Sequence, residues 1–262
     1  MSGIMEAVKK GFSVASKSLG LVGILIAFNL IGNLISMSMA VPQGTEMTPQ
    51  MTTGAMIFSV IFILVSIFFQ GASLGLVRDF IKQGAMKLSG FAGYGAKYYL
   101  RLLGLGLIIV ALIAVVALIA GVIIAVTAPL NNTVVTGVAV VIAIAIGVMA
   151  AVLYFIPLTL SPYALISDEA GVVVSMKKSL GIMKPLAKVA RLILLYVVLI
   201  LISLGVGFAV GFLVGLIAAV LPQAIGRVLM ATATSVINGY LGIVMTAAFM
   251  VFYFAIEKEK AA

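Results

Sequence analysis

Long apolar runs separated by short polar segments make up most of the chain. Runs of at least about 20 residues without Asp, Glu, Lys or Arg cover approximately residues 19–40, 54–77, 102–128, 134–160, 192–220 and 228–256. A bilayer core of about 30 Å is crossed by about 20 apolar residues of helix. The runs lack the polar–apolar alternation of outer-membrane strands. The pattern therefore predicts an all-α integral membrane bundle of six transmembrane helices, arranged as three hairpins.

Mixed polar and apolar segments precede three of these runs and predict amphipathic helices in the membrane interface. In the first of them, Met5, Val8, Phe12 and Ala15 share one helical face. The segment 168–184 has a similar stripe, formed by Val173, Met176, Leu180 and Met183, with Ser175 facing away. The Lys-Lys pairs of these two segments lie at a similar distance from the next run, which indicates possible units 1–79, 80–167 and 168–262. A shared membrane topology without a repeat would explain the same similarity.

The basic residues lie almost entirely on one side of the predicted bundle. Of the 16 Lys and Arg residues, only Arg227 falls on the opposite side. The positive-inside rule then predicts cytoplasmic termini in a multi-pass protein of the cytoplasmic membrane. Hydrophobic residues make up 64% of the chain and charged residues 9%. The net charge of +9 is therefore interpreted as a topology signal, and no nucleic-acid partner is expected.

Small residues recur at every fourth position of two predicted spans. Such faces let helix backbones approach closely, and the sequence predicts tight helix packing there. The expected packing residues are Ser203, Gly207, Gly211, Gly215, Ala139, Ala143 and Gly147. The alternative is that the glycines line a lipid groove.

Amide side chains within the apolar runs are costly unless they are paired. Asn29 and Asn33 lie one turn apart, and Asn238 lies near the middle of the last run, close to Ser235. We expect these amides to form hydrogen bonds between the first and last spans. The alternative is a permeation path or a site for a lipid headgroup. Pro157 is expected to kink or end the fourth span.

The segment "SPYALISDEAGVVVSMKKSLGIMKP" is a polar island in this apolar chain. It contains Asp168 and Glu169, and the cations Lys177, Lys178 and Lys184 are expected to contact lipid headgroups. The chain has no Cys or His, so we expect no metal and no cofactor. Asp168 and Glu169 are neighbours on a helix, point about 100° apart and hold one metal poorly. We interpret them as the start of a capped helix rather than as catalytic groups.

Around "IPLTLSPYALISDEAGVVVSMKKSLGIMKP" and "LGLVRDFIKQGAMKLSGF" the sequence resembles a group of six-helix membrane families of largely unknown function. These families include the membrane domain attached to some glycerophosphodiester phosphodiesterases. The resemblance implies a topology and no activity, because the catalytic residues of those phosphodiesterases belong to a separate soluble barrel.

The sequence thus favours a non-enzymatic membrane protein, a scaffold or accessory component that acts on lipid or on a partner protein. The first alternative is a transporter or exporter of a small or lipid-like molecule, with the three amides Asn29, Asn33 and Asn238 near its path. The second is a lipid-acting enzyme that uses Asp168 and Glu169. The expected partners are membrane lipids and either another membrane protein or a second copy of the chain.

Overall fold

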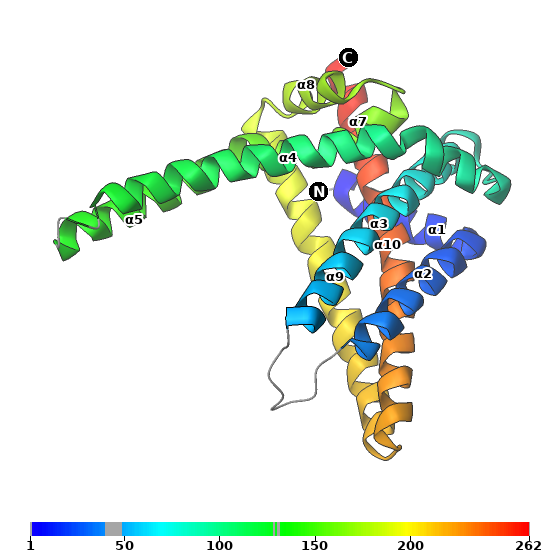
Figure 1. Ribbon diagram of the computed structural model, residues 1–262. Helices are drawn as coiled ribbons and strands as arrows, with labels where there is room; N and C mark the ends of the chain where they lie inside the picture. Colours follow the sequence, from blue (N-terminus) through cyan, green and yellow to red (C-terminus); the bar gives the residue numbers. More distant parts are fainter. Residues whose placement is uncertain (1, 40–48, 128, 130–131, 262) are drawn as a thin grey trace. The chain divides into compact units, whose positions relative to one another are not determined.

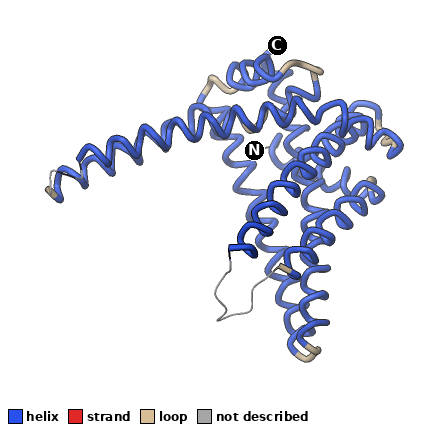
Figure 2. Tube along the Cα trace, in the orientation of Figure 1, coloured by secondary structure: helices blue, strands red, loops and turns tan. Residues whose placement is uncertain are grey.

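The computed structural model describes residues 2–39, 49–127, 129 and 132–261, and within these ranges the chain is helical without a strand (Figure 2). The long helices are α1 (Ser2–Lys17), α2 (Leu19–Ser38), α3 (Pro49–Gln83), α4 (Phe91–Thr127), α5 (Thr133–Ala150), α9 (Leu186–Ala219) and α10 (Gln223–Ala261). The short ones are η1 (Leu88–Gly90), η3 (Ala151–Phe155), α6 (Ile156–Leu158), α7 (Ser161–Ser167) and α8 (Val172–Ile182).

Among the described residues, six helical segments are long and apolar enough to cross a membrane. They are Leu19–Ser38, Thr53–Gln83, Leu88–Thr127, Thr133–Ser167, Leu186–Ala219 and Gln223–Glu259. The prediction of an all-α chain with six such helices is confirmed. Most of the helices extend beyond the charge-free runs, because helical hydrogen bonds can continue into polar flanking sequence. For example, α3 continues past Arg78 and Asp79 and ends before Gly84, whose positive φ of 73° lets the chain turn away.

The chain forms two compact units. The first comprises residues 1–99 and 194–255, and the second comprises residues 100–193 and 256–262. These units do not follow the possible repeat boundaries at 79 and 167, and the threefold repeat stays a prediction.

In the first unit, α10 is the most buried of the spanning helices, and α1 and α2 pack closely on it. In the apolar 18-residue stretch of α10 that could span a membrane, 61% is buried, which is the largest share among the six candidate spans. Glycines bring two neighbouring helices close to it. A Cβ at Gly11 of α1 would lie 2.6 Å from the carbonyl oxygen of Val244, and one at Gly239 would lie 2.9 Å from the backbone nitrogen of Ile26 in α2. Helices α9 and α10 follow one another through a short turn and are drawn in yellow and orange in Figure 1.

The face of α1 that packs within the protein coincides only in part with the predicted apolar stripe. Met5 is 51% exposed, Phe12 is half-buried, and Val8 and Ala15 are buried. The other buried residues of α1 are Ile4, Ala7, Gly11 and Val14. The contact of α1 with α10 at Gly11 determines which face is covered, and this face is rotated away from Met5.

In the second unit the fourth span is interrupted near Pro157. Helix α5 ends at Ala150 and is followed by the π-helical turn η3, the short α6 and then α7. Proline has no N–H for the helical ladder, and π-turns accommodate such defects. The break expected at this proline is thus present.

The serine face of α8 is buried within the protein. Ser175 and Ser179 are 0% and 1% exposed, whereas Val173 is 56% exposed. The Ser179 hydroxyl donates to the carbonyl of Pro157, and the Ser175 hydroxyl donates to the carbonyl of Gly171 at 2.8 Å. The outward direction predicted for Ser175 is wrong, because small serines with satisfied hydroxyls let α8 approach α6 and α7. Within the predicted stripe, Met183 is buried and Val173 is exposed.

Candidate functional site

A hollow of about 460 Å³ lies between α9 and α10. Its α9 wall includes Ser203, Gly207 and Gly211, and its α10 wall includes Thr234 and Asn238. The added Cβ at Gly207 or Gly211 would meet no atom within 4 Å. The glycine spacing therefore produces a bare strip of helix backbone that faces the hollow.

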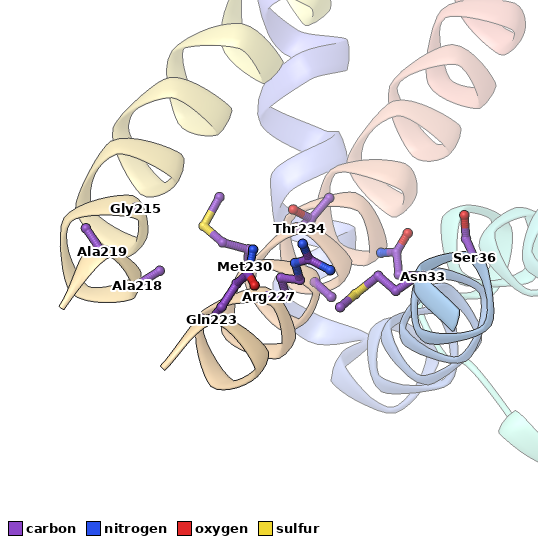
Figure 3. A pocket seen from close by; sticks show the side chains of 12 residues that line it. Asn33, Ser36, Gly215, Ala218, Ala219, Gln223, Arg227, Met230 and Thr234 are labelled. Atoms are coloured by element: carbon purple, nitrogen blue, oxygen red, sulfur yellow. The ribbon is translucent and has the colours of Figure 1, made fainter. Parts of the chain in front are cut away.

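A larger hollow of about 600 Å³ lies beside the turn that joins α9 to α10. Figure 3 shows Arg227, Met230 and Thr234 of α10 between Gly215 of α9 and Asn33 of α2. Met230 and Thr234 also line the smaller hollow. We call the two hollows together the α9–α10 groove, which extends along α10 from Gln223 to Met245.

Arg227 is the cation of the α9–α10 groove. Its side chain is exposed, and no acidic side chain among the described residues pairs with it. Arg78 and Arg191 differ, since each forms an ion pair with a carboxylate, at 2.9 Å with Asp79 and 3.0 Å with Glu259. Arg227 thus offers its full positive charge to a ligand at one end of the groove.

A third hollow of about 210 Å³ lies among α2, α3 and α10, and we call it the amide pocket. Its polar lining residues are Asn29, Ser66, Gln70, Ser73, Asn238 and Thr246. Its other lining residues are Leu25, Phe28, Phe69 and Gly242. Asn238 and Gly242 also line the α9–α10 groove, so these two residues separate the hollows.

The structure separates the three predicted amides into different roles. The Asn33 side chain donates to the Ser235 hydroxyl at 2.9 Å and connects α2 to α10. The Asn29 side chain donates to the carbonyl of Leu25 on its own helix at 2.8 Å. Asn238 is exposed and has no hydrogen-bond partner among the described residues. The expected interhelical bond is therefore present at Asn33, and it is wrong for Asn29 and Asn238, which face hollows instead.

The predicted tight packing is also wrong for four glycines. An added Cβ at Gly207, Gly211, Gly215 or Gly147 would meet no described atom within 4 Å. Ser203 lines the groove, whereas Ala139 and Ala143 of α5 are buried. A spacing of four residues creates a small-residue face, but the neighbouring helix determines whether that face is covered.

Asp168 and Glu169 end one helix rather than starting the next. Asp168 is the C-cap of α7, and Glu169 has a φ of 53°, in the left-handed region. The N–H of Ala170 donates to the carbonyl of Leu165 at 3.1 Å, which is the outer bond of a Schellman motif. Helix α8 begins only after Gly171. The predicted capping role is therefore wrong, because a helix end with this backbone turn precedes the α8 start.

The charges of the polar island are largely paired with one another. The Lys178 ammonium group lies 2.6 Å from Asp168 and also contacts Glu257 of α10. Arg101 donates to the backbone carbonyl of Glu169 at 3.0 Å. These contacts connect the α7–α8 turn to α4 and α10 within the second unit. Of the predicted headgroup contacts, Lys177 and Lys184 are exposed, while Lys178 is occupied by the two carboxylates.

A second polar cluster, in the first unit, was missed by the sequence analysis. The Arg78 guanidinium donates to Asp79 and, at 2.9 Å, to the Tyr98 hydroxyl, and the Tyr94 hydroxyl donates to Asp79. Gly75 makes room for the Tyr94 ring, which would clash with a Cβ at that position. The signal available in the sequence for this cluster was the pair Tyr94 and Tyr98, four residues apart, downstream of the adjacent Arg78 and Asp79. The cluster fastens the start of α4 to the end of α3.

Comparison of the chain with protein-family models, with curated proteins and with solved structures found no match. The resemblance to six-helix membrane families therefore stays a prediction.

Proposed function

We propose that the chain is a non-enzymatic membrane protein that binds a lipid-like anionic amphiphile in the α9–α10 groove. The observation that carries this proposal is the bare glycine strip of α9, which faces a hollow instead of another helix. Glycine is expensive in a helix interior, by up to about 1 kcal/mol relative to alanine. A strip of glycines that no neighbouring helix covers is favourable when a ligand covers it.

The groove offers the two kinds of contact that an amphiphile needs. An acyl chain can lie against the backbone at Gly207 and Gly211, with Met230 and Leu241 on the opposite wall. A phosphate or carboxylate at the other end meets Arg227, whose guanidinium binds such oxygens in a bidentate manner. The N-terminus of α10 begins at Gln223 and adds a favourable dipole for an anion.

The remaining features support a binding role over catalysis. Asp168 is neutralised by Lys178, which supports a structural role for the polar island. A membrane protein that binds such an amphiphile is a scaffold or accessory component that acts on lipid. If it also moved the bound lipid across the membrane, it would be a transporter, which is the alternative function.

We further propose a multi-pass arrangement in the cytoplasmic membrane as three hairpins, with both termini cytoplasmic. The one-sided distribution of basic residues supports this orientation. In this arrangement α1 and α8 lie in the interface, where the exposed Lys177 and Lys184 meet lipid headgroups.

The test measures binding of a fluorescent acyl-chain phosphatidylglycerol to the detergent-purified protein. Gly211→Leu fills the groove with a side chain, and Gly147→Leu is the matched control because its added Cβ also meets no neighbour. Displacing about two methylene groups of the acyl chain costs about 1.6 kcal/mol, which corresponds to at least about tenfold weaker binding.

We expect this loss for Gly211→Leu and unchanged binding for Gly147→Leu, with similar thermal stability in both. Arg227→Gln should weaken binding of the anionic probe and leave binding of a fluorescent acyl methyl ester, which has no phosphate or carboxylate, unaffected. Equal binding by Gly211→Leu and Gly147→Leu would refute the groove as the lipid site.

A further inference from the structure

We propose that the amide pocket is a separate binding site, for an uncharged ligand that carries a hydroxyl or carboxamide group on an apolar body. The pocket and the proposed lipid groove share Asn238 and Gly242, but Gln70, Asn29 and Ser73 line the amide pocket alone. The inference therefore does not rest on lipid binding in the groove.

The polar groups of the amide pocket lie deep within the spanning helices. Asn29 is near the middle of the span Leu19–Ser38, and Gln70 is well inside the span Thr53–Gln83. Asn238 is well inside the span Gln223–Glu259. In a bilayer these depths are poor in water, so polar groups there need partners from protein or ligand.

Several of these groups lack a partner within the described part of the chain. Gln70 and Asn238 make no hydrogen bond there. Ser73 is only 4% exposed, and its hydroxyl oxygen is buried without a hydrogen-bond partner. Other helical serines are satisfied locally, as Ser59 and Ser235 are by the carbonyl four residues earlier. Gln70 and Asn238 are exposed on the protein surface. In a bilayer an unpaired amide at this depth is destabilising even where lipid surrounds it, and a ligand that supplies the missing hydrogen bonds removes that cost.

The lining determines the charge of the ligand. No Asp, Glu, Lys or Arg is among the residues that line the pocket, so an ion would lie within the membrane without a counter-charge. A cation would also use only the amide and hydroxyl oxygens and would leave the N–H donors of Gln70 and Asn238 unused. A neutral group that both donates and accepts satisfies both kinds of atom.

The rest of the pocket wall is apolar and aromatic. Phe28 and Phe69 stack with ring centroids 4.2 Å apart, and both line the pocket with Leu25. This wall fits a hydrocarbon part next to the polar group. A neutral lipid with a free hydroxyl, such as a diacylglycerol, has this combination.

The test compares two probes that differ by one hydroxyl, 1,2-dioctanoylglycerol and the dioctanoyl ester of 1,2-propanediol. Affinities are measured by native mass spectrometry of the full-length protein in detergent. Gln70→Met keeps the side-chain shape and removes the amide. Gln83→Met makes the same change on α3 away from the pocket and is the matched control. Ser73→Ala is a second, smaller change within the pocket.

We expect wild type and Gln83→Met to bind the hydroxyl probe about tenfold or more tightly than the deoxy probe. In Gln70→Met this preference should fall to near unity while binding of the deoxy probe is unchanged, and Ser73→Ala should reduce it. Arg227→Gln, which alters the groove, should keep the preference. Equal affinities of wild type for the two probes overturn the proposal. The proposal is also overturned if both Gln70→Met and Ser73→Ala keep the full preference for the hydroxyl probe. A third refuting result is a sodium site: sodium chloride, but not choline chloride, raises the thermal stability of wild type, and Gln70→Met abolishes this effect.

Discussion

Two glycines three residues apart on α10 allow a sharp test of which helix contacts hold the first unit together. A Cβ at Gly239 would lie 2.7 Å from the Cγ1 of Ile26 and 2.9 Å from its backbone nitrogen. A Cβ at Gly242 would meet no atom within 4 Å. The substitutions Gly239→Ala and Gly242→Ala are thus chemically identical and differ only in what faces the new methyl group.

The expected free energies have opposite signs. Alanine is more favourable than glycine in a helix by up to about 1 kcal/mol, so Gly242→Ala should be neutral or slightly stabilising. Gly239→Ala gains the same propensity but forces α2 away from α10, because the backbone nitrogen cannot move as a side chain does. Overpacking of this kind costs about 1–3 kcal/mol, so the two variants should differ by about 1–3 kcal/mol in stability.

The assay is unfolding of the detergent-purified protein by increasing SDS, followed by far-UV circular dichroism and by loss of the folded peak in size-exclusion chromatography. The chain has no Trp and no Cys, so these readouts replace indole fluorescence and thiol dyes. If Gly239→Ala is as stable as Gly242→Ala, α2 and α10 do not touch at Ile26 and the packing argument fails.

Three further predictions concern other contacts. The hydrogen bond from Asn33 to Ser235 should give a coupling of about 0.6–1.7 kcal/mol in a double-mutant cycle of Asn33→Leu and Ser235→Ala, and a coupling near zero would contradict it. Lys178→Met should speed hydrogen exchange of the α7–α8 turn while Lys177→Met does not, since only Lys178 is ion-paired; each partly exposed pair contributes about 1 kcal/mol or less. Reporter fusions after Lys87 and at the C-terminus should read cytoplasmic, and opposite readings at these two sites would exclude the three-hairpin topology.

The Asp168–Glu169 pair illustrates why the polar island was only partly predictable. An acidic pair before an amphipathic stretch is typical of a helix start, which is why the pair was predicted to begin α8. The positive φ of Glu169 belongs instead to the end of α7, a position that glycine usually occupies. Helix α7 is short and begins beside Pro162. No change in hydrophobicity along the sequence separates it from the fourth span.

The number and place of the membrane helices were determined by the sequence alone, because hydrophobicity summed over about 20 residues is a local property and does not depend on neighbours. The break at Pro157 was equally local, since proline lacks an N–H wherever it lies in a helix. What opposes each face was decided only by the tertiary structure. Gly211 and Gly239 are the same residue type in two long apolar helices, yet one faces a hollow and the other touches the backbone of α2. Asn33 and Asn238 differ in the same way, because whether an amide finds a partner depends on a helix far away in the chain.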